Sequence, residues 1–281
     1  MIRGALAPRP ARSHGKPREG AAISTTGSTD IDLAISLPAT VGERYDQDTE
    51  WCWIEVAGEP RQRLRFHDYA EIFGVKGLYE RLFYDELQCN SPRTMRELLA
   101  QALDQGGQDP AELRVLDLGA GNGMVAEELD DLGADRLVGV DIIEAARDAA
   151  QRDRPGLYDD YLVADMCEPS AGEDRTLREA DLNCLTSVAA LGFGDIPPAA
   201  FANAFNYVAP GGFVAFNLRD HFLEDTDPSG FNLLIRRMLT EGTIDPVVRR
   251  RYRHRLSVSG QPLYYVAIVA RKTADVPAGW L

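Results

Sequence analysis

A chain of 281 residues, 44% hydrophobic and 26% charged, can bury a full globular core. Its formal net charge of -14 makes nucleic acid an unlikely partner, because an acidic surface repels phosphate backbones. No apolar run approaches the roughly 18 residues that span a bilayer, so no membrane contact is expected. The four cysteines lack paired spacing, which favours neither zinc nor disulfides and suits a cytoplasmic location.

The first 90 residues divide into two segments. Residues 1–30 are rich in arginine, proline, glycine, serine and threonine, and we expect a disordered tail because such a segment buries little apolar surface. Residues 31–90 are rich in aromatic side chains, and Leu78, Leu82 and Phe83 recur at helical spacing. We expect a helical cap or lid here, in which Trp51 and Trp53 either line a substrate cavity or anchor the cap.

Residues 91–281 alternate β-rich apolar runs with helical patterns, which is typical of βαβ units and a parallel sheet. A first helix is expected with Ser91 as N-cap and Pro92 at the first helical position. The expected parallel strands are Arg114–Leu118, Arg136–Asp141, Asp160–Ala164, Leu182–Ser187 and Gly212–Phe216. The other expected helices are Asn122–Asp131, Ile143–Arg152, Pro198–Tyr207 and Ser229–Thr240.

Two further strands, residues 247–258 and 263–271, are separated by a turn of hairpin length and predict an antiparallel pair. The expected fold is therefore α/β, with a doubly wound, seven-stranded, mostly parallel sheet that ends in a C-terminal antiparallel hairpin. Alternation places Tyr252 and His254 on one face of the first hairpin strand. The other face carries an arginine row, Arg249, Arg251, Arg253 and Arg255. We interpret this arginine row as a solvated strand face and rank a phosphate-binding role below it.

The strongest local motif is Asp117-Leu-Gly-Ala-Gly-Asn-Gly123, which follows an apolar strand and precedes an amphipathic helix. Its glycines allow a ligand to approach the backbone closely. The spacing is G-x-G-x-G rather than the G-x-G-x-x-G of dinucleotide-binding loops. The carboxylate of Asp117 would repel a pyrophosphate but would suit the ammonium of an amino acid. The predicted ligand is a nucleoside with an amino acid tail.

Two later acids stand at the ends of the next two expected strands. Asp141 is expected to accept from the hydroxyls of a ribose, and Asp165 from an exocyclic amino group. Ile142 and Met166 offer apolar surface to an adenine ring. Each acid taken alone could instead be a helix N-cap. Three acids at one rim of the sheet predict a shared pocket.

This order of motifs resembles the class I S-adenosylmethionine-dependent methyltransferases over about residues 95–272. The turn Val208-Ala-Pro-Gly-Gly212 also resembles one of that family. The segment 181–187 departs from the family's N/D-P-P-Y/F pattern, which argues against methylation of exocyclic base or glutamine nitrogens. The resemblance implies S-adenosyl-L-methionine as cofactor. No metal is expected, and nine residues are the candidates to hold the cofactor. These are Asp117, Gly119, Ala120, Gly121 and Gly123 around the methionine part, Asp141 and Ile142 at the ribose and adenine, and Asp165 and Met166 at the adenine.

Methyl transfer requires positioning above all, and a hydroxyl acceptor is also helped by a general base, usually histidine. His221, just beyond the fifth expected strand, is the first candidate, and His67 in the cap is the second. Tyr69 and Tyr79 are candidate lid contacts. The competing interpretation of each histidine is a hydrogen-bonded structural role.

The expected function is methylation of an oxygen or nitrogen of a small molecule, which makes that acceptor the expected partner. Two alternatives stay open. One is a non-catalytic S-adenosylmethionine-binding protein with an interaction or regulatory role, and the other is a protein or RNA methyltransferase. The sequence does not set the oligomeric state, for which a homodimer is one option.

Overall fold

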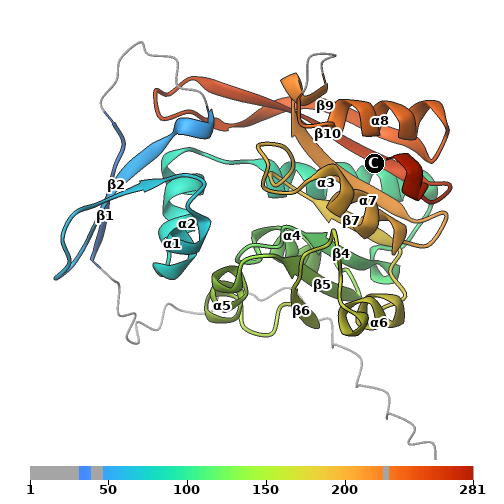
Figure 1. The fold of residues 1–281 in the computed structure, drawn as a ribbon, viewed down its shortest axis with the longest axis horizontal. Coiled ribbons are helices and arrows are strands. Elements are labelled where there is room, and N and C mark those ends of the chain that lie inside the picture. The colour runs from blue at the N-terminus through green and yellow to red at the C-terminus, as the bar shows by residue number, and fades with distance from the viewer. Residues whose placement is uncertain (1–31, 39–46, 224–227, 281) are drawn as a thin grey trace, which may run out of the picture. The chain divides into compact units, whose positions relative to one another are not determined.

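The strands between residues 114 and 272 form one mixed sheet of order β6-β5-β4-β7-β8-β10-β9 (Figure 1). The first five strands in this order run parallel, and β10 lies antiparallel to both β8 and β9. Their bounds are β4 (Arg114–Leu118), β5 (Arg136–Asp141), β6 (Asp160–Val163), β7 (Cys184–Ser187), β8 (Phe213–Arg219), β9 (Ile244–Leu256) and β10 (Pro262–Lys272). The expected fold class is confirmed.

The computed structural model describes residues 32–38, 47–223 and 228–280. The expected disordered tail of residues 1–30 lies outside these residues. Residues from Asp32 onward belong to one compact unit, which contains both the expected cap and the sheet. The boundaries expected for the cap and the sheet domain stay a prediction.

Helices cover both faces of the sheet because the parallel strands are apolar on both sides. Val115 packs in one cluster with Leu98 of α3, whereas its neighbour Leu116 packs in another with Phe201 of α7. Successive residues of the strand therefore pack against helices on opposite faces of the sheet, as the pleat requires. The helices are α3 (Ser91–Gly106), α4 (Met124–Leu132), α5 (Glu144–Asp153), α6 (Ala171–Glu179), α7 (Pro198–Asn206) and α8 (Phe231–Thr240).

Two helical details differ from the expectation. Ser91 is the first residue of α3, and Asn90 before it is the N-cap. Helix α6 was not expected, because Leu177 is its one buried side chain and gives no apolar stripe. Its start does carry a capping box, in which the side chains of Ser170 and Glu173 each bond the other's backbone N–H.

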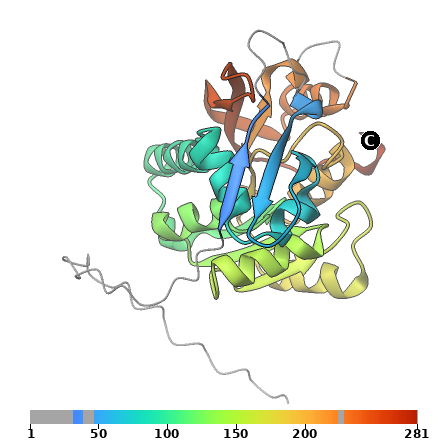
Figure 2. The same ribbon diagram turned by 90° about the vertical axis from the view of Figure 1, so that its left-hand side faces the viewer.

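The helical cap expected over residues 31–90 is wrong in its first half. The chain there forms an antiparallel sheet of order β1-β2-β3, and Figure 2 shows β1 and β2 side by side. Alternation in β2 buries Cys52 and Ile54 and leaves Trp51 and Trp53 half-buried on the other face, which is the pattern of a strand. The bounds are β1 (Leu33–Ser36), β2 (Trp51–Val56) and β3 (Gln62–Arg65).

Helices follow in the second half of this segment. They are α1 (Tyr69–Gly74), α2 (Leu78–Glu80) and a π-helical turn, η2 (Arg81–Glu86). Phe73 of α1 packs against Ala146 and Ala149 of α5, so this region of the cap rests on the sheet domain.

The arginine row of β9 is solvated as expected except at Arg255. A register shift between β9 and β10 at Leu263 and Tyr264 interrupts the alternation and turns Arg255 inward. Its guanidinium pairs with the carboxylate of Glu50, and the two side chains are 4% and 0% exposed. Glu50 also accepts from the backbone N–H of Val258 at 2.7 Å. This buried pair joins the N-terminal segment to the C-terminal hairpin.

Candidate active site

The loop between β4 and α4 holds three glycines in the left-handed region. Their φ angles are +74° at Gly119, +52° at Gly121 and +91° at Gly123. A Cβ at Gly119 would lie 2.7 Å from the Cβ of Ala190, so a larger residue would clash as well as strain the backbone. The backbone N–H groups of Gly119 and Ala120 both donate to the carbonyl of Val140, at 2.9 and 3.1 Å. The loop is thereby fixed to the end of β5.

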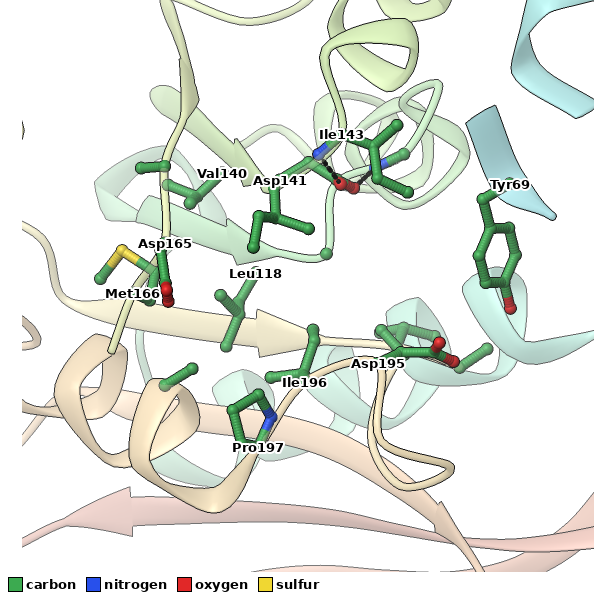
Figure 3. Close-up of a pocket in the computed structure, with 18 of the residues that line it drawn as sticks. Tyr69, Leu118, Val140, Asp141, Ile143, Asp165, Met166, Asp195, Ile196 and Pro197 are labelled. Atoms are coloured by element: carbon green, nitrogen blue, oxygen red, sulfur yellow. Dashed lines mark hydrogen bonds between the residues drawn. The ribbon is translucent and has the colours of Figure 1, made fainter. Parts of the chain in front are cut away.

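Asp141 connects this loop to the end of β5. One carboxylate oxygen accepts from the backbone N–H of Gly121 at 2.9 Å and the other from that of Ile143 at 3.0 Å (Figure 3). Burial raises the pKa of this carboxyl, and the two hydrogen bonds oppose the shift. The alternative that Asp141 is an N-cap is wrong, because Ile143 occupies that position in α5.

Asp165 follows β6 and stands apart from the helix that comes next. Its carboxylate accepts from the backbone N–H of Cys167 at 2.8 Å, whereas the N-cap of α6 is Ser170. The N-cap alternative is therefore wrong for Asp165 as well. Both acids mark the carboxyl ends of parallel strands, where open α/β sheets bind ligands.

These strand ends line one cavity. Six of the nine expected cofactor residues contribute to its wall, namely Gly119, Gly121, Asp141, Ile142, Asp165 and Met166. The cap contributes Tyr69, Phe73 and Tyr79. In Figure 3, Asp165 and Met166 lie on one side of the cavity, and Tyr69 and Asp195 lie on the other. The sheet and the cap therefore enclose the site together.

The other three expected cofactor residues, Asp117, Ala120 and Gly123, do not line this cavity in the described region of the chain. Asp117 is 1% exposed and accepts hydrogen bonds from the hydroxyls of Thr186 and Tyr158, each at 2.9 Å. Burial raises its pKa to about 6, although these hydrogen bonds lower it in part. Asp117 thus supports the loop from behind.

Two tyrosines that the sequence analysis did not single out hold the loop from the same side. The hydroxyl of Tyr161 donates to the carbonyl of Gly121 at 2.8 Å, while that of Tyr158 reaches Asp117. Both rings pack over Gly139 in β5, where a Cβ would lie 2.9 Å from Tyr158 and 3.0 Å from Tyr161. A glycine inside an otherwise apolar strand was the available signal for this close approach.

A second, smaller cavity adjoins the first. The two share some of their walls, contributed by Tyr69, Tyr79, Ala189, Ala190 and Asp195. The second cavity is otherwise lined mainly by rings, from Phe66, His67, Phe83, Phe193, His254 and Tyr265, together with Gln47, Cys89 and Arg255. Trp51 and Trp53 line neither cavity; arginine guanidinium groups lie over their indole rings on the β2–β3 face.

His67 lies in the second cavity and pairs with Asp195 at its boundary with the first. The Nδ1 atom of His67 is 3.0 Å from a carboxylate oxygen of Asp195, and the two side chains are 16% and 34% exposed. Asp195 was missed by the sequence analysis, although the run Gly192-Phe-Gly-Asp195 is typical of a turn. This distance allows a hydrogen bond between the carboxylate and the imidazole, as an acid that orients a base requires.

The loop that carries Asp195 is strained. Ala189 and Phe193 have φ angles of +58° and +53°, which residues with a Cβ seldom adopt. The backbone N–H of Ala189 donates to the side chain of Asn217 in β8 at 2.6 Å, which holds the first of these residues in place. Such strain gathers at functional sites.

The other expected base, His221, lies in the short helical turn η4 (Asp220–Leu223) after β8. Its side chain is outside the described region of the structure, so its catalytic role stays a prediction. His254 is buried and stacks on Tyr265 with a centroid distance of 4.1 Å, as a core residue does. Burial lowers the pKa of His254 well below its usual value.

Residues 88–252 match a family described as a methyltransferase domain. No curated protein gives a significant match to the chain. Among solved structures, the N-methyltransferase NodS from Bradyrhizobium japonicum WM9, in complex with S-adenosyl-l-homocysteine, is similar with a TM-score of 0.50 and 18% identity, covering 74% of this chain and 98% of that one. A magnesium protoporphyrin IX methyltransferase from Synechocystis PCC 6803 with bound SAM has a TM-score of 0.44 and 15% identity, covering 65% and 79%. No described helix is both long and apolar enough to cross a membrane.

Proposed function

This chain belongs to the methyltransferase-domain family of class I S-adenosylmethionine-dependent enzymes, and we propose from that membership that it methylates an oxygen or nitrogen of a small molecule. One observation carries the proposal. The His67–Asp195 pair lies where the cavity of the glycine loop meets a second cavity lined by rings. Donor and acceptor molecules in these two cavities would meet beside a candidate base.

The residues of the first cavity fit S-adenosyl-L-methionine. Gly119 and Gly121 line the cavity with their backbone, so the methionine part can approach the main chain closely. Asp141 keeps acceptor capacity for ribose hydroxyls, since a carboxylate has about four acceptor positions and its contacts are to the backbone N–H groups of Gly121, Ile142 and Ile143. Ile142 and Met166 supply the apolar surface that an adenine ring needs.

S-adenosyl-L-methionine held there would supply a sulfonium methyl group for in-line displacement by the acceptor atom, with S-adenosylhomocysteine as the leaving product. His67 takes the proton that the acceptor loses, and Asp195 orients the ring and stabilises the imidazolium. Tyr69 and Tyr79, which face both cavities, exclude water from the contact.

The enclosure of the second cavity favours a small acceptor over a protein or RNA. Its walls come from the cap, the loop after β7 and the C-terminal hairpin, so an acceptor is surrounded on several sides. The paired His67 and Asp195 favour turnover over binding alone, because a binding protein has no use for a base at this boundary. The cytoplasmic location expected from the sequence stays a prediction.

Calorimetric titration with S-adenosylmethionine and S-adenosylhomocysteine tests the cofactor assignment. Release of S-adenosylhomocysteine with a panel of phenols and amines then tests turnover in the wild type and in His67→Ala. We expect both ligands to bind each protein, and turnover to fall about 10²- to 10⁴-fold in the variant. Failure of the wild type to bind either ligand contradicts the proposal, and unchanged turnover in His67→Ala removes the assigned base.

A further inference from the structure

Gln47 places an unsatisfied polar atom at the second cavity. It begins the short helical turn η1 (Gln47–Thr49), lines this cavity and is 6% exposed. Its Nε2 group donates to the hydroxyl of Tyr265 at 2.8 Å. Its Oε1 atom is buried and has no hydrogen-bond partner within the described residues. The nitrogen of the amide is therefore hydrogen-bonded, and its oxygen is available to accept a hydrogen bond.

The position of Gln47 is fixed by its surroundings. The backbone N–H of Glu50, three residues later, donates to the carbonyl of Gln47 at 3.4 Å, and Glu50 forms the buried pair with Arg255. The backbone carbonyl of Glu50 also accepts from Phe66 at 3.0 Å. Because η1 is tied to β9 and to the end of β3, Oε1 cannot turn to bulk water without breaking these contacts.

A buried acceptor without a partner is unfavourable, so native structures nearly always satisfy it. Polar side chains such as His67 and Arg255 also line the cavity, but none of the described residues bonds Oε1. A molecule that enters the cavity can supply the partner that the described residues do not provide. That molecule needs an O–H or N–H group on the side facing Gln47.

The shape of the cavity adds a second requirement. Phe66 and Phe83 meet edge to face with a centroid distance of 5.5 Å, and His254 stacks on Tyr265. His67 and Phe193 also adjoin, with centroids 5.6 Å apart. Walls built from rings favour a planar aromatic ligand over an extended aliphatic chain.

We infer that Gln47 determines acceptor specificity, and that the acceptor is a small aromatic compound with two donor groups. One group, the nucleophile, faces His67 and Asp195, and the other donates to Oε1 of Gln47. This inference rests on the proposed function, because it takes the second cavity to be the acceptor site. It names the substrate class as ring compounds such as dihydroxy- or aminohydroxybenzenes.

The test compares two probes of similar size that differ by one donor, resorcinol and 3-methylphenol. Their affinities for the protein saturated with S-adenosylhomocysteine are measured by calorimetry or by saturation-transfer NMR. We expect the wild type to bind resorcinol about 10-fold more tightly, as one hydrogen bond to a buried acceptor allows. In Gln47→Met and Gln47→Ala the ratio should fall to about one, whereas Gln151→Met, an exposed change on α5, should keep it.

The outcomes distinguish a failure of the Gln47 inference from a failure of the proposed function. A wild-type ratio near one overturns the inference, and so does a ratio that persists in either Gln47 variant. The wild-type comparison decides even if a Gln47 variant does not fold. If the wild type binds S-adenosylhomocysteine yet prefers neither probe, the inference alone fails. If it does not bind S-adenosylhomocysteine, the proposed function fails.

Discussion

The Nδ1 atom of His67 lies 3.0 Å from a carboxylate oxygen of Asp195, although 128 residues separate them along the chain. His67 precedes α1 in the N-terminal segment, whereas Asp195 stands on the strained loop between β7 and α7. The pair forms only when the cap packs against the sheet domain. The proposed base and its acid are therefore brought together by the cap and the sheet.

Asp195→Asn should lower kcat about 10- to 100-fold, because an amide cannot stabilise the imidazolium as a carboxylate does. Acceptor KM should change little, since the substitution keeps the size of the side chain. Asp195→Glu, which restores the charge, should recover some of the loss. Steady-state kinetics with a saturating cofactor measure the effects on kcat and on acceptor KM separately. A change in KM alone, with kcat intact, would show that Asp195 merely shapes the cavity.

Asp141→Ala should weaken the binding of S-adenosylhomocysteine by roughly 1–3 kcal/mol, because it removes the ribose acceptor and leaves the N–H groups of Gly121 and Ile143 unmatched. Calorimetry gives the affinity, and circular dichroism confirms the fold. Asp148→Ala, an exposed acid on α5, is the matched control and should bind as the wild type does. Equal affinities in the two variants would refute the ribose assignment.

Asp117 should make stability depend on pH between about 4 and 6. Its pKa is raised to about 6 in the folded protein, mainly by burial, against about 3.9 unfolded. The folded state therefore holds the proton of Asp117 more tightly than the unfolded state does. The stabilisation that this proton gives the fold is fully present below the pKa of the unfolded state, and it is lost as pH rises through about 6. This difference in pKa corresponds to roughly 3 kcal/mol.

Urea unfolding of the wild type and of Asp117→Asn at several pH values isolates this contribution. The free energy of unfolding of the wild type should decline relative to the variant as pH rises from about 4 to about 6. Asp104→Asn, at an exposed position in α3, should run parallel to the wild type. Parallel curves for Asp117→Asn as well would contradict the raised pKa.

Arg255→Met should destabilise the protein by about 3–5 kcal/mol, because it leaves the carboxylate of Glu50 buried without a counter-charge. Adding Glu50→Gln should recover some of the loss. Arg253→Met, two residues earlier and exposed, should change stability by less than about 0.5 kcal/mol. Denaturant unfolding measures all four proteins. A small effect of Arg255→Met would mean that water reaches the pair.

Much of the fold could be predicted because its signals are local. The apolar runs at β4 and β5 and the glycines of the loop indicated the sheet and its ligand rim. Two of the errors arose where the local pattern was weak or was overridden by tertiary structure. Helix α6 buries only Leu177, and the register shift in β9 turned Arg255 away from its row.

The second cavity could not be predicted, because its key residues come from distant segments. Gln47, His67, Asp195 and Tyr265 meet only after the cap, the loop after β7 and the hairpin have packed together. His67 was proposed as a base from its chemistry alone. Neither its partner Asp195 nor the unused oxygen of Gln47 has a signature in the sequence.

The buried contact between Glu50 and Arg255 bears on how ligands could enter and leave the cavities. Swinging the N-terminal sheet outward as a rigid flap would separate a desolvated carboxylate from its guanidinium, so that route is closed on energetic grounds. Entry would then require rotation of rings such as Tyr69 and Tyr79, which line both cavities, or movement of the strained loop that follows β7. We therefore expect the rate of product release to fall as the ring of the product becomes larger.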